Sequence, residues 1–225
     1  MPAKQITIDV ISDVVCPWCF VGRKRLQQAL NLLPDVEATI RWRPYQLDPN
    51  IPAGGKDRKA YMKEKFGSGS RANEIHDQLI KTGEDNDIEF DFDAIEVAPN
   101  TLDAHRVIHW AAQAGTPDAQ DKLVGELFSL YFEQGQNIGD HKVLVEAAAK
   151  AGLEAPVIEK LLETDADKQN IRQEIETATR IGVRGVPCFI IDQKYAVMGA
   201  QSAEVLADAI SQAASGFEPG IIEDR

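Results

Sequence analysis

The chain has 225 residues, of which 44% are hydrophobic, so it is long enough to bury a substantial core as one domain with an insertion. Its 24 basic and 36 acidic residues give a net charge of −12, which argues against nucleic acids and anionic membranes as partners. No segment approaches the roughly 18 apolar residues of a membrane span, and the beginning of the chain carries no apolar run typical of a signal peptide. We therefore expect a cytoplasmic protein that neither binds nucleic acid nor enters a membrane.

The first part of the chain predicts a β-α-β unit. Hydrophobic residues alternate from Ile6 to Val10 and Ile11 extends the run, as in a partly buried strand. Apolar positions at spacings of three and four then predict a helix from Cys16 to just before Pro34, and residues 37–47 alternate as a second strand. A right-handed crossover makes these strands parallel. The start of the helix then lies at the carboxyl end of the first strand, where open α/β sheets carry their chemistry.

A Cys-Pro-Trp-Cys motif occupies the start of this helix. If Cys16 caps the helix, its sulfur lies beside free N–H groups and the positive end of the helix dipole, which favour the nucleophilic thiolate. Pro17 suits the first helical position, and Cys19 follows one turn later, close enough to form a disulfide with Cys16. A zinc site needs four ligands whereas the chain has three cysteines, and structural disulfides are rare in the cytosol. The pattern therefore favours a redox-active pair.

The middle of the chain is predicted to be nearly all helical. It follows a turn-rich stretch over residues 48–55 and shows one brief alternation over residues 88–92. Capping residues, prolines and glycines divide it into predicted helices over 57–66, 70–83, 100–115, 116–135, 140–152, 156–162 and 165–181. We expect residues 52–165 to form a helical insertion domain that packs on a discontinuous parent domain of residues 1–51 and 166–225.

The end of the chain returns to strands. Residues 186–191 form an apolar run that contains Pro187, and a proline at the start of a strand often marks a special turn or a cis peptide bond. Residues 195–198 predict a further strand, and Ser202 caps a final helix that extends to about Ala214. The predicted order is therefore β-α-β, a helical block, and β-β-α.

This order of elements resembles the DsbA-type thioredoxin fold, and in particular the FrnE-like branch of cytoplasmic dithiol oxidoreductases. That branch is similar to 2-hydroxychromene-2-carboxylate isomerases and kappa-class glutathione transferases. The motifs that carry the resemblance are Ser12-Asp-Val-Val-Cys-Pro-Trp-Cys19, Asn100-Thr101 with Ala104-His105-Arg106, Gly182-Val-Arg-Gly-Val-Pro187, and Gly199-Ala200-Gln201. The resemblance implies an α/β thioredoxin fold with a large all-helical insertion between the βαβ and ββα halves. Some FrnE-like proteins carry a second cysteine pair near the C-terminus, which this chain lacks.

The resemblance also implies roles for the matching residues. Cys16 would be the attacking thiol and Cys19 the buried resolving thiol. Pro187 would be the family's cis-proline beside the cysteine pair. Val186 would be the residue whose backbone pairs with an extended substrate chain, as an added strand does.

We also expect Pro17, Trp18, His105 and Arg106 in the substrate site, and His105 has a second interpretation. Pro17 and Trp18 lie between the two cysteines. His105 and Arg106 match the family's helical-domain motif and are placed in the cleft facing the cysteines, although His105 could equally be a satisfied interior histidine. His105 and His109 have a spacing that suits metal ligands, but no HExxH pattern accompanies them, so we predict no metal site.

Two other residues near the motifs are assigned structural roles. Asp13 could accept the proton of Cys19, or it could bind nearby N–H groups of its loop. We favour the loop role because a carboxylate beside Cys16 would oppose thiolate formation. Cys188 follows Pro187, but strand alternation turns its side chain to the other face, so we expect it in the core.

Three functional hypotheses follow. The first is an oxidoreductase that reduces, oxidises or isomerises disulfides of proteins or small thiols, without a tightly bound cofactor and with glutathione as a candidate co-substrate. In a reducing cytosol, reduction or isomerisation is favoured over oxidation. The second is a glutathione-dependent isomerase or transferase of a small aromatic compound, whose relatives typically have serine in place of Cys16 and need no Cys19. The third is a holdase or accessory protein whose role would survive Cys16→Ser. The oligomeric state stays open, with a dimer among the options.

Overall fold

The computed structural model describes residues 3–67, 70–113, 116 and 118–216. The two ends of the chain build a four-stranded mixed sheet with the strand order β2-β1-β5-β6, in which β1 pairs in parallel with β2 and antiparallel with β5. The predicted β-α-β and β-β-α halves are therefore both present. The strands of this sheet are β1 (Lys4–Ser12), β2 (Val36–Pro44), β5 (Cys188–Ile191) and β6 (Tyr195–Met198).

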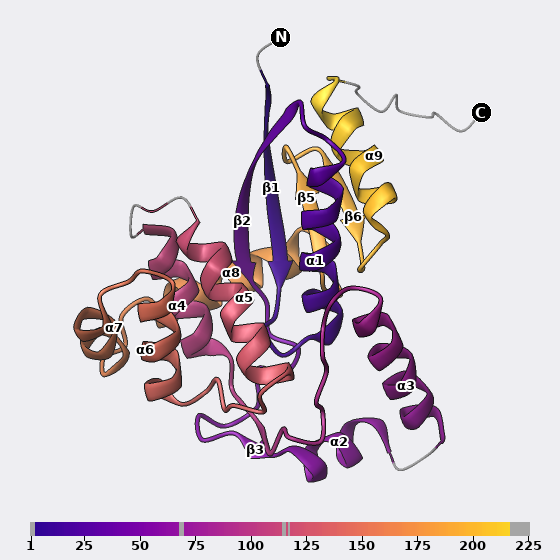
Figure 1. Cartoon of the computed structure of the whole chain (residues 1–225). Helices are drawn as coiled ribbons and strands as arrows, with labels where there is room; N and C mark the ends of the chain where they lie inside the picture. The colour runs from indigo at the N-terminus through magenta and orange to yellow at the C-terminus, as the bar shows by residue number, and fades with distance from the viewer. Residues whose placement is uncertain (1–2, 68–69, 114–115, 117, 217–225) are drawn as a thin grey trace.

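Helices cover both faces of the sheet (Figure 1), with α1 and α9 packed together on one face and α8 across the other. The middle of the chain supplies the remaining helices, gathered at the lower end of the sheet in this view. Among the described residues, no helix has the length and apolarity needed to cross a membrane. The helices are α1 (Pro17–Asn31), α2 (Arg58–Phe66), α3 (Ser70–Glu84), α4 (Leu102–Gln113), α5 (Ala119–Phe132), α6 (His141–Lys150), α7 (Ala155–Leu162), α8 (Lys168–Arg180) and α9 (Ala203–Ala214).

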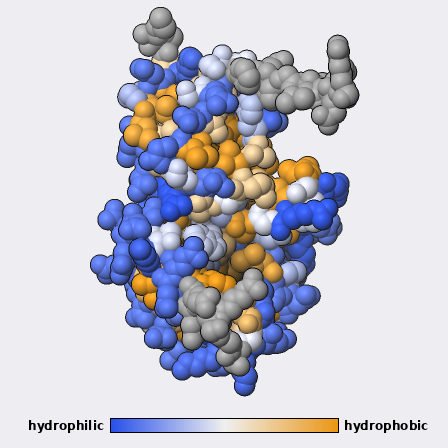
Figure 2. Space-filling model, turned by 90° about the vertical axis from the view of Figure 1, so that its right-hand side faces the viewer, coloured by the Kyte–Doolittle hydropathy of each residue, from blue (hydrophilic) through white to orange (hydrophobic). Residues whose placement is uncertain are grey.

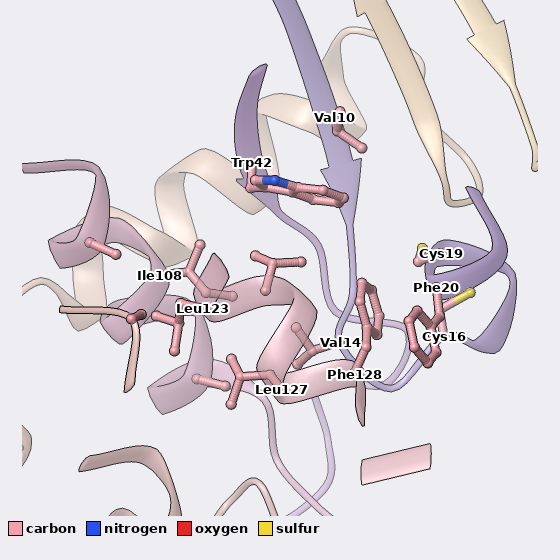
Figure 3. Packing of buried hydrophobic residues seen from close by; sticks show 14 of the residues in the cluster. Val10, Val14, Cys16, Cys19, Phe20, Trp42, Ile108, Leu123, Leu127 and Phe128 are labelled. Atoms are coloured by element: carbon pink, nitrogen blue, oxygen red, sulfur yellow. The ribbon is translucent and has the colours of Figure 1, made fainter. Parts of the chain in front are cut away.

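One hydrophobic core joins the sheet to the middle helices. Figure 3 shows Phe20 of α1 beside Phe128 of α5, and these rings stack with centroids 5.1 Å apart and planes 8° from parallel. Trp42 of β2 meets Phe128 edge-on, with the centroids 6.5 Å apart. Aromatic pairs in these geometries add to the stability that burial alone provides. The helical middle thus packs against both the sheet and α1.

The middle segment differs from the prediction in two places. It contains a short antiparallel ladder between β3 (Lys56–Asp57) and β4 (Val97–Ala98), so it is not entirely helical. Residues 88–92 form no strand, because their backbone bonds to a helix instead: the Asp91 N–H donates to the carbonyl of Phe132 at the end of α5, 2.8 Å away. The predicted helix end at Gly115 and helix start at Pro117 lie outside the described residues.

Candidate active site

Cys16 caps the N-terminus of α1, as the motif predicts. Its backbone is extended (φ −96°, ψ 112°), Pro17 occupies the first turn, and the Cys16 side chain makes no capping hydrogen bond. The Cys16 carbonyl accepts from the N–H of Cys19 at 3.0 Å and from that of Phe20 at 3.3 Å, which closes the first turn. The sulfur is therefore free to react at a helix end whose N–H groups favour negative charge.

The second cysteine lies deeper than the first. Cys16 is 4% exposed and Cys19 is 1% exposed, and both are free thiols. Burial raises the pKa of Cys19 well above its usual range, and the adjacent Cys16 sulfur raises it further through a hydrogen bond and its charge. Figure 3 shows both sulfurs at the first turn of α1, next to the ring of Phe20. Cys19 thus stays protonated while it is held beside Cys16.

A distant segment of the chain completes this site. The peptide bond between Val186 and Pro187 is cis, and the Cys16 thiol donates to the carbonyl oxygen of Val186, with 3.7 Å between sulfur and oxygen. Pro17 and Trp18 are half-buried beside Cys16, so each keeps some surface there. The structure therefore brings four of the predicted site residues to the thiol pair: Pro17, Trp18, Val186 and Pro187.

Asp13 takes the loop role that the sequence favours. One carboxylate oxygen, Oδ2, accepts the N–H of Leu47 at 2.8 Å, and the backbone carbonyl of Asp13 accepts the N–H of Cys16 at 3.0 Å. The side chain is 1% exposed. Asp13 thus holds the end of β1 against the loop that follows β2.

His105 lies beneath the same loop and not in an open cleft. It is 4% exposed, and its Nε2 is 2.8 Å from the carbonyl oxygen of Tyr45 and 3.4 Å from Asp13 Oδ1. A carbonyl oxygen only accepts, so Nε2 carries the proton in this contact. The interior interpretation of His105 describes its position, and contact of His105 with substrate stays a prediction, because Cys16 is equally buried.

Arg106 also lies in the interior, and contact of Arg106 with substrate stays a prediction. Arg106 has no exposed surface. Its guanidinium donates to the carbonyls of Ala166 (2.6 Å), Leu161 (2.8 Å) and Thr164 (2.8 Å), and to the carboxylate of Asp103 (2.8 Å). These bonds tie α4 to the segment between α7 and α8, so Arg106 is a structural residue.

The other candidate residues lie apart from the cysteine pair. His109 Nδ1 lies 3.5 Å from Glu174 of α8, so it does not share a site with His105. Within the described ranges, no group of three or more histidine, cysteine or acidic side chains is arranged to hold a metal ion. Cys188 is buried with Ile11 and Ala178 between the sheet and α8, and burial raises the pKa of its thiol.

Sequence reasoning missed one residue of this site, Gly22. It is buried in α1, one turn beyond Cys19, and faces the ring of Pro187. The available signal was a glycine inside an otherwise helical pattern, which usually has a packing or functional reason.

Comparison with known proteins agrees with this geometry. The family of DSBA-like thioredoxin domains matches residues 7–211. The uncharacterized protein YwbO of Bacillus subtilis is 29% identical over 92% of this chain and 96% of its own length. Human glutathione S-transferase kappa 1 is 25% identical over 97% of both chains. The crystal structure of a probable DsbA oxidoreductase from Streptomyces coelicolor superposes with a TM-score of 0.86, at 28% identity over 97% of this chain and 94% of that chain.

Two further solved structures share the fold at lower identity. A 2-hydroxychromene-2-carboxylate isomerase has a TM-score of 0.66 at 15% identity, covering 93% of this chain and 97% of that chain. The cytosolic disulfide reductase DsbM of Pseudomonas aeruginosa, solved with glutathione, has a TM-score of 0.62 at 14% identity, covering 93% and 96%. The predicted resemblance to DsbA-type proteins, to the isomerases and to the kappa-class transferases is confirmed, whereas the FrnE-like branch stays a prediction.

Proposed function

Because the chain belongs to the family of DSBA-like thioredoxin domains, we propose that it is a thiol–disulfide oxidoreductase that uses Cys16 and Cys19 as its redox pair. The observation that carries the proposal is the position of Cys16. Its sulfur lies at the N-terminus of α1 and contacts the Val186 carbonyl, with the protonated Cys19 one turn further along the helix. A nucleophilic thiol with a second thiol in reach is the arrangement that disulfide exchange needs.

The reaction runs through a mixed disulfide. The Cys16 thiolate attacks one sulfur of the substrate disulfide, a Cys16–substrate bond forms, and the other substrate sulfur leaves as a thiolate. Cys19 then loses its proton and attacks the Cys16 sulfur, which releases the second substrate thiolate and leaves Cys16 and Cys19 joined. The substrate has gained two electrons, and an external thiol such as glutathione returns them to the pair. In reverse, the same steps oxidise a substrate dithiol.

Substrate binding is assigned to the backbone beside the pair. The Val186 carbonyl contacts Cys16, so an extended chain that delivers a disulfide to Cys16 could form main-chain hydrogen bonds at Val186, as in strand addition. Pro17 and Trp18 offer partly exposed surface next to the sulfur. Figure 2 shows hydrophobic residues among hydrophilic ones across the middle of the face that it presents. We propose protein or small disulfides in the cytoplasm as substrates, with glutathione as co-substrate.

The decisive experiment follows reduction of a disulfide-linked protein substrate with glutathione or dithiothreitol as the electron donor. Wild type, Cys16→Ser and Cys19→Ser are compared side by side. We expect turnover by wild type, none by Cys16→Ser, and a trapped mixed disulfide with Cys19→Ser. Absence of any rate above background in wild type would contradict the proposal.

Replacement of Pro187 tests the binding assignment. Pro187→Thr keeps both cysteines and should change the amount of partner protein trapped as a mixed disulfide, because the backbone beside Cys16 is altered. The trapped material is quantified on non-reducing gels after acid quenching. Equal amounts in wild type and variant would argue against a role for this segment in substrate release.

A glutathione-dependent isomerase or transferase is the second candidate, and the human kappa-class relative is the observation that favours it. Such a reaction adds glutathione to a small aromatic compound and needs no resolving thiol. Loss of activity in Cys19→Ser therefore favours the oxidoreductase, whereas full activity toward an aromatic electrophile in Cys19→Ser favours the transferase.

A further inference from the structure

Gly22 occupies a position in α1 where glycine is costly. Within a helix, glycine is less favourable than alanine by about 1 kcal/mol. Gly22 is fully buried in a 15-residue helix, so neither a turn nor solvent exposure explains it. A glycine at this position is expected where a neighbouring group leaves no room for a side chain.

That neighbour is the segment that faces Cys16. A Cβ at position 22 would lie 2.9 Å from Cγ and 3.4 Å from Cβ of Pro187, and 3.2 Å from Cζ of Phe189. The Pro187 ring closes on its own backbone, so it cannot turn aside as a flexible side chain could. Phe189 has no exposed surface and belongs to β5, where it pairs with Val10 of β1. The substitution must therefore move backbone.

We propose that Gly22 is a positioning residue that sets the distance between α1 and the substrate-pairing backbone at Val186, and thereby favours extended polypeptide disulfides over small ones. An alanine requires the separation from Pro187 Cγ to grow beyond 2.9 Å, and reaching ordinary contact at 3.4 Å takes a shift of about 0.5 Å. The same shift acts on the contact of 3.7 Å between Cys16 and the Val186 carbonyl. This inference rests on the proposed disulfide exchange at Cys16.

The two classes of substrate depend differently on this distance. An extended peptide reacts with Cys16 while its backbone pairs with Val186, so it needs the thiol and the carbonyl at one fixed separation. A small disulfide such as hydroxyethyl disulfide has no backbone to pair and needs only access to the sulfur. The ratio of the two rate constants therefore reports the spacing and is insensitive to a general loss of folded protein.

The test measures second-order rate constants of reduced wild type and Gly22→Ala with a disulfide-linked extended peptide and with hydroxyethyl disulfide. We expect the peptide-to-small-disulfide ratio to fall at least tenfold in Gly22→Ala. The matched control is Gly125→Ala in α5. There a Cβ would lie 2.8 Å from the guanidinium of Arg23, the end of a flexible side chain, so the variant disturbs the ion pair of Arg23 with Asp121 and leaves the Pro187 ring untouched. Its ratio should stay within twofold of wild type.

A second background, compared with Pro187→Ala alone, tests whether the effect of Gly22→Ala depends on the Pro187 ring. Pro187→Ala lacks the Cγ atom, so adding Gly22→Ala to it should change the peptide-to-small-disulfide ratio by less than twofold. The double variant also provides the test if Gly22→Ala alone does not fold. An unchanged ratio in folded Gly22→Ala, or a further tenfold loss in the double variant, would overturn the inference. Failure of wild type to react with either disulfide would overturn the proposed function as well.

Discussion

Replacing Arg106 distinguishes a structural role from a substrate-binding role. Arg106→Met keeps much of the side-chain volume but removes the charge and every donor. In the folded protein it leaves the carbonyls of Leu161, Thr164 and Ala166 and the carboxylate of Asp103 without this partner. Because the guanidinium is fully buried, water does not reach it to replace these bonds in the folded state.

The size of the effect follows from the burial. Removing one partner of a buried, hydrogen-bonded ion pair typically costs about 3–5 kcal/mol, a large share of the roughly 5–15 kcal/mol that stabilises a folded domain. We therefore expect Arg106→Met to lower the free energy of unfolding by about 3–5 kcal/mol. Arg106→Lys should lose less, because an ammonium keeps the charge but cannot present the planar fork that reaches three carbonyls at once.

Urea unfolding supplies the stability, with an unchanged slope showing that the same folded and unfolded states are compared. The rate of disulfide exchange at Cys16, measured on the folded variants without urea, should stay within twofold of wild type because Arg106 has no surface at the site. The reasoning is refuted if the free energy of unfolding of Arg106→Met lies within about 1 kcal/mol of that of wild type while the rate of disulfide exchange falls tenfold. Such a result would return Arg106 to the substrate site.

Three further predictions concern titration and capping. Burial and the Cys16 sulfur raise the pKa of Cys19 in the folded protein, so the stability that the protonated thiol contributes is full below the pKa of the unfolded chain, about 8.5, and is lost as the pH rises further. Above that pH, the unfolding free energy of wild type should fall relative to that of Cys19→Ala. A constant difference between the two from pH 7 to 10 would contradict this. Burial acts to raise the pKa of Asp103, but the hydrogen bonds and charges of Arg106 and His141 together outweigh it and the net pKa is lowered. Wild type should therefore lose its stability advantage over Asp103→Asn as the pH falls below about 4 in urea titrations, and an advantage undiminished at pH 3 would count against this prediction. Asp140 accepts a hydrogen bond from a backbone N–H of α6 at 2.7 Å. Asp140→Ala should therefore lower the free energy of unfolding, measured in urea, by about 1 kcal/mol, and Asp140→Asn should lower it much less. Equal losses in the two variants would show that the cap is unimportant.

Local rules were enough to predict the half of the site that is close in sequence. The extended Cys16, the proline after it and the three-residue spacing to Cys19 define the start of a helix without help from the rest of the chain. The same rules placed β6 and α9 almost to the residue and β1 to within two residues, because hydrophobic alternation and capping act over a few neighbours; β2, however, ends at Pro44 and not at the predicted residue 47. The brief alternation at residues 88–92 does not mark a strand, since the Asp91 N–H bonds to the carbonyl of Phe132 at the end of α5.

Tertiary structure decided what the remaining motif residues do. His105 and Arg106 look alike in sequence as polar residues on one helix, and only the loop after β2 and the carbonyls before α8 show that both are interior. The contact between Cys16 and Val186 joins residues 170 positions apart, and the sheet order that brings them together is a property of the whole chain. By itself the sequence determined which sulfur lies at the start of a helix, because that depends only on neighbouring residues. Only the tertiary structure decides which segment lies opposite this sulfur and how close it lies. That distance depends on the packing of α1 against Pro187, because the absence of a Cβ at Gly22 matters only where another segment occupies the space.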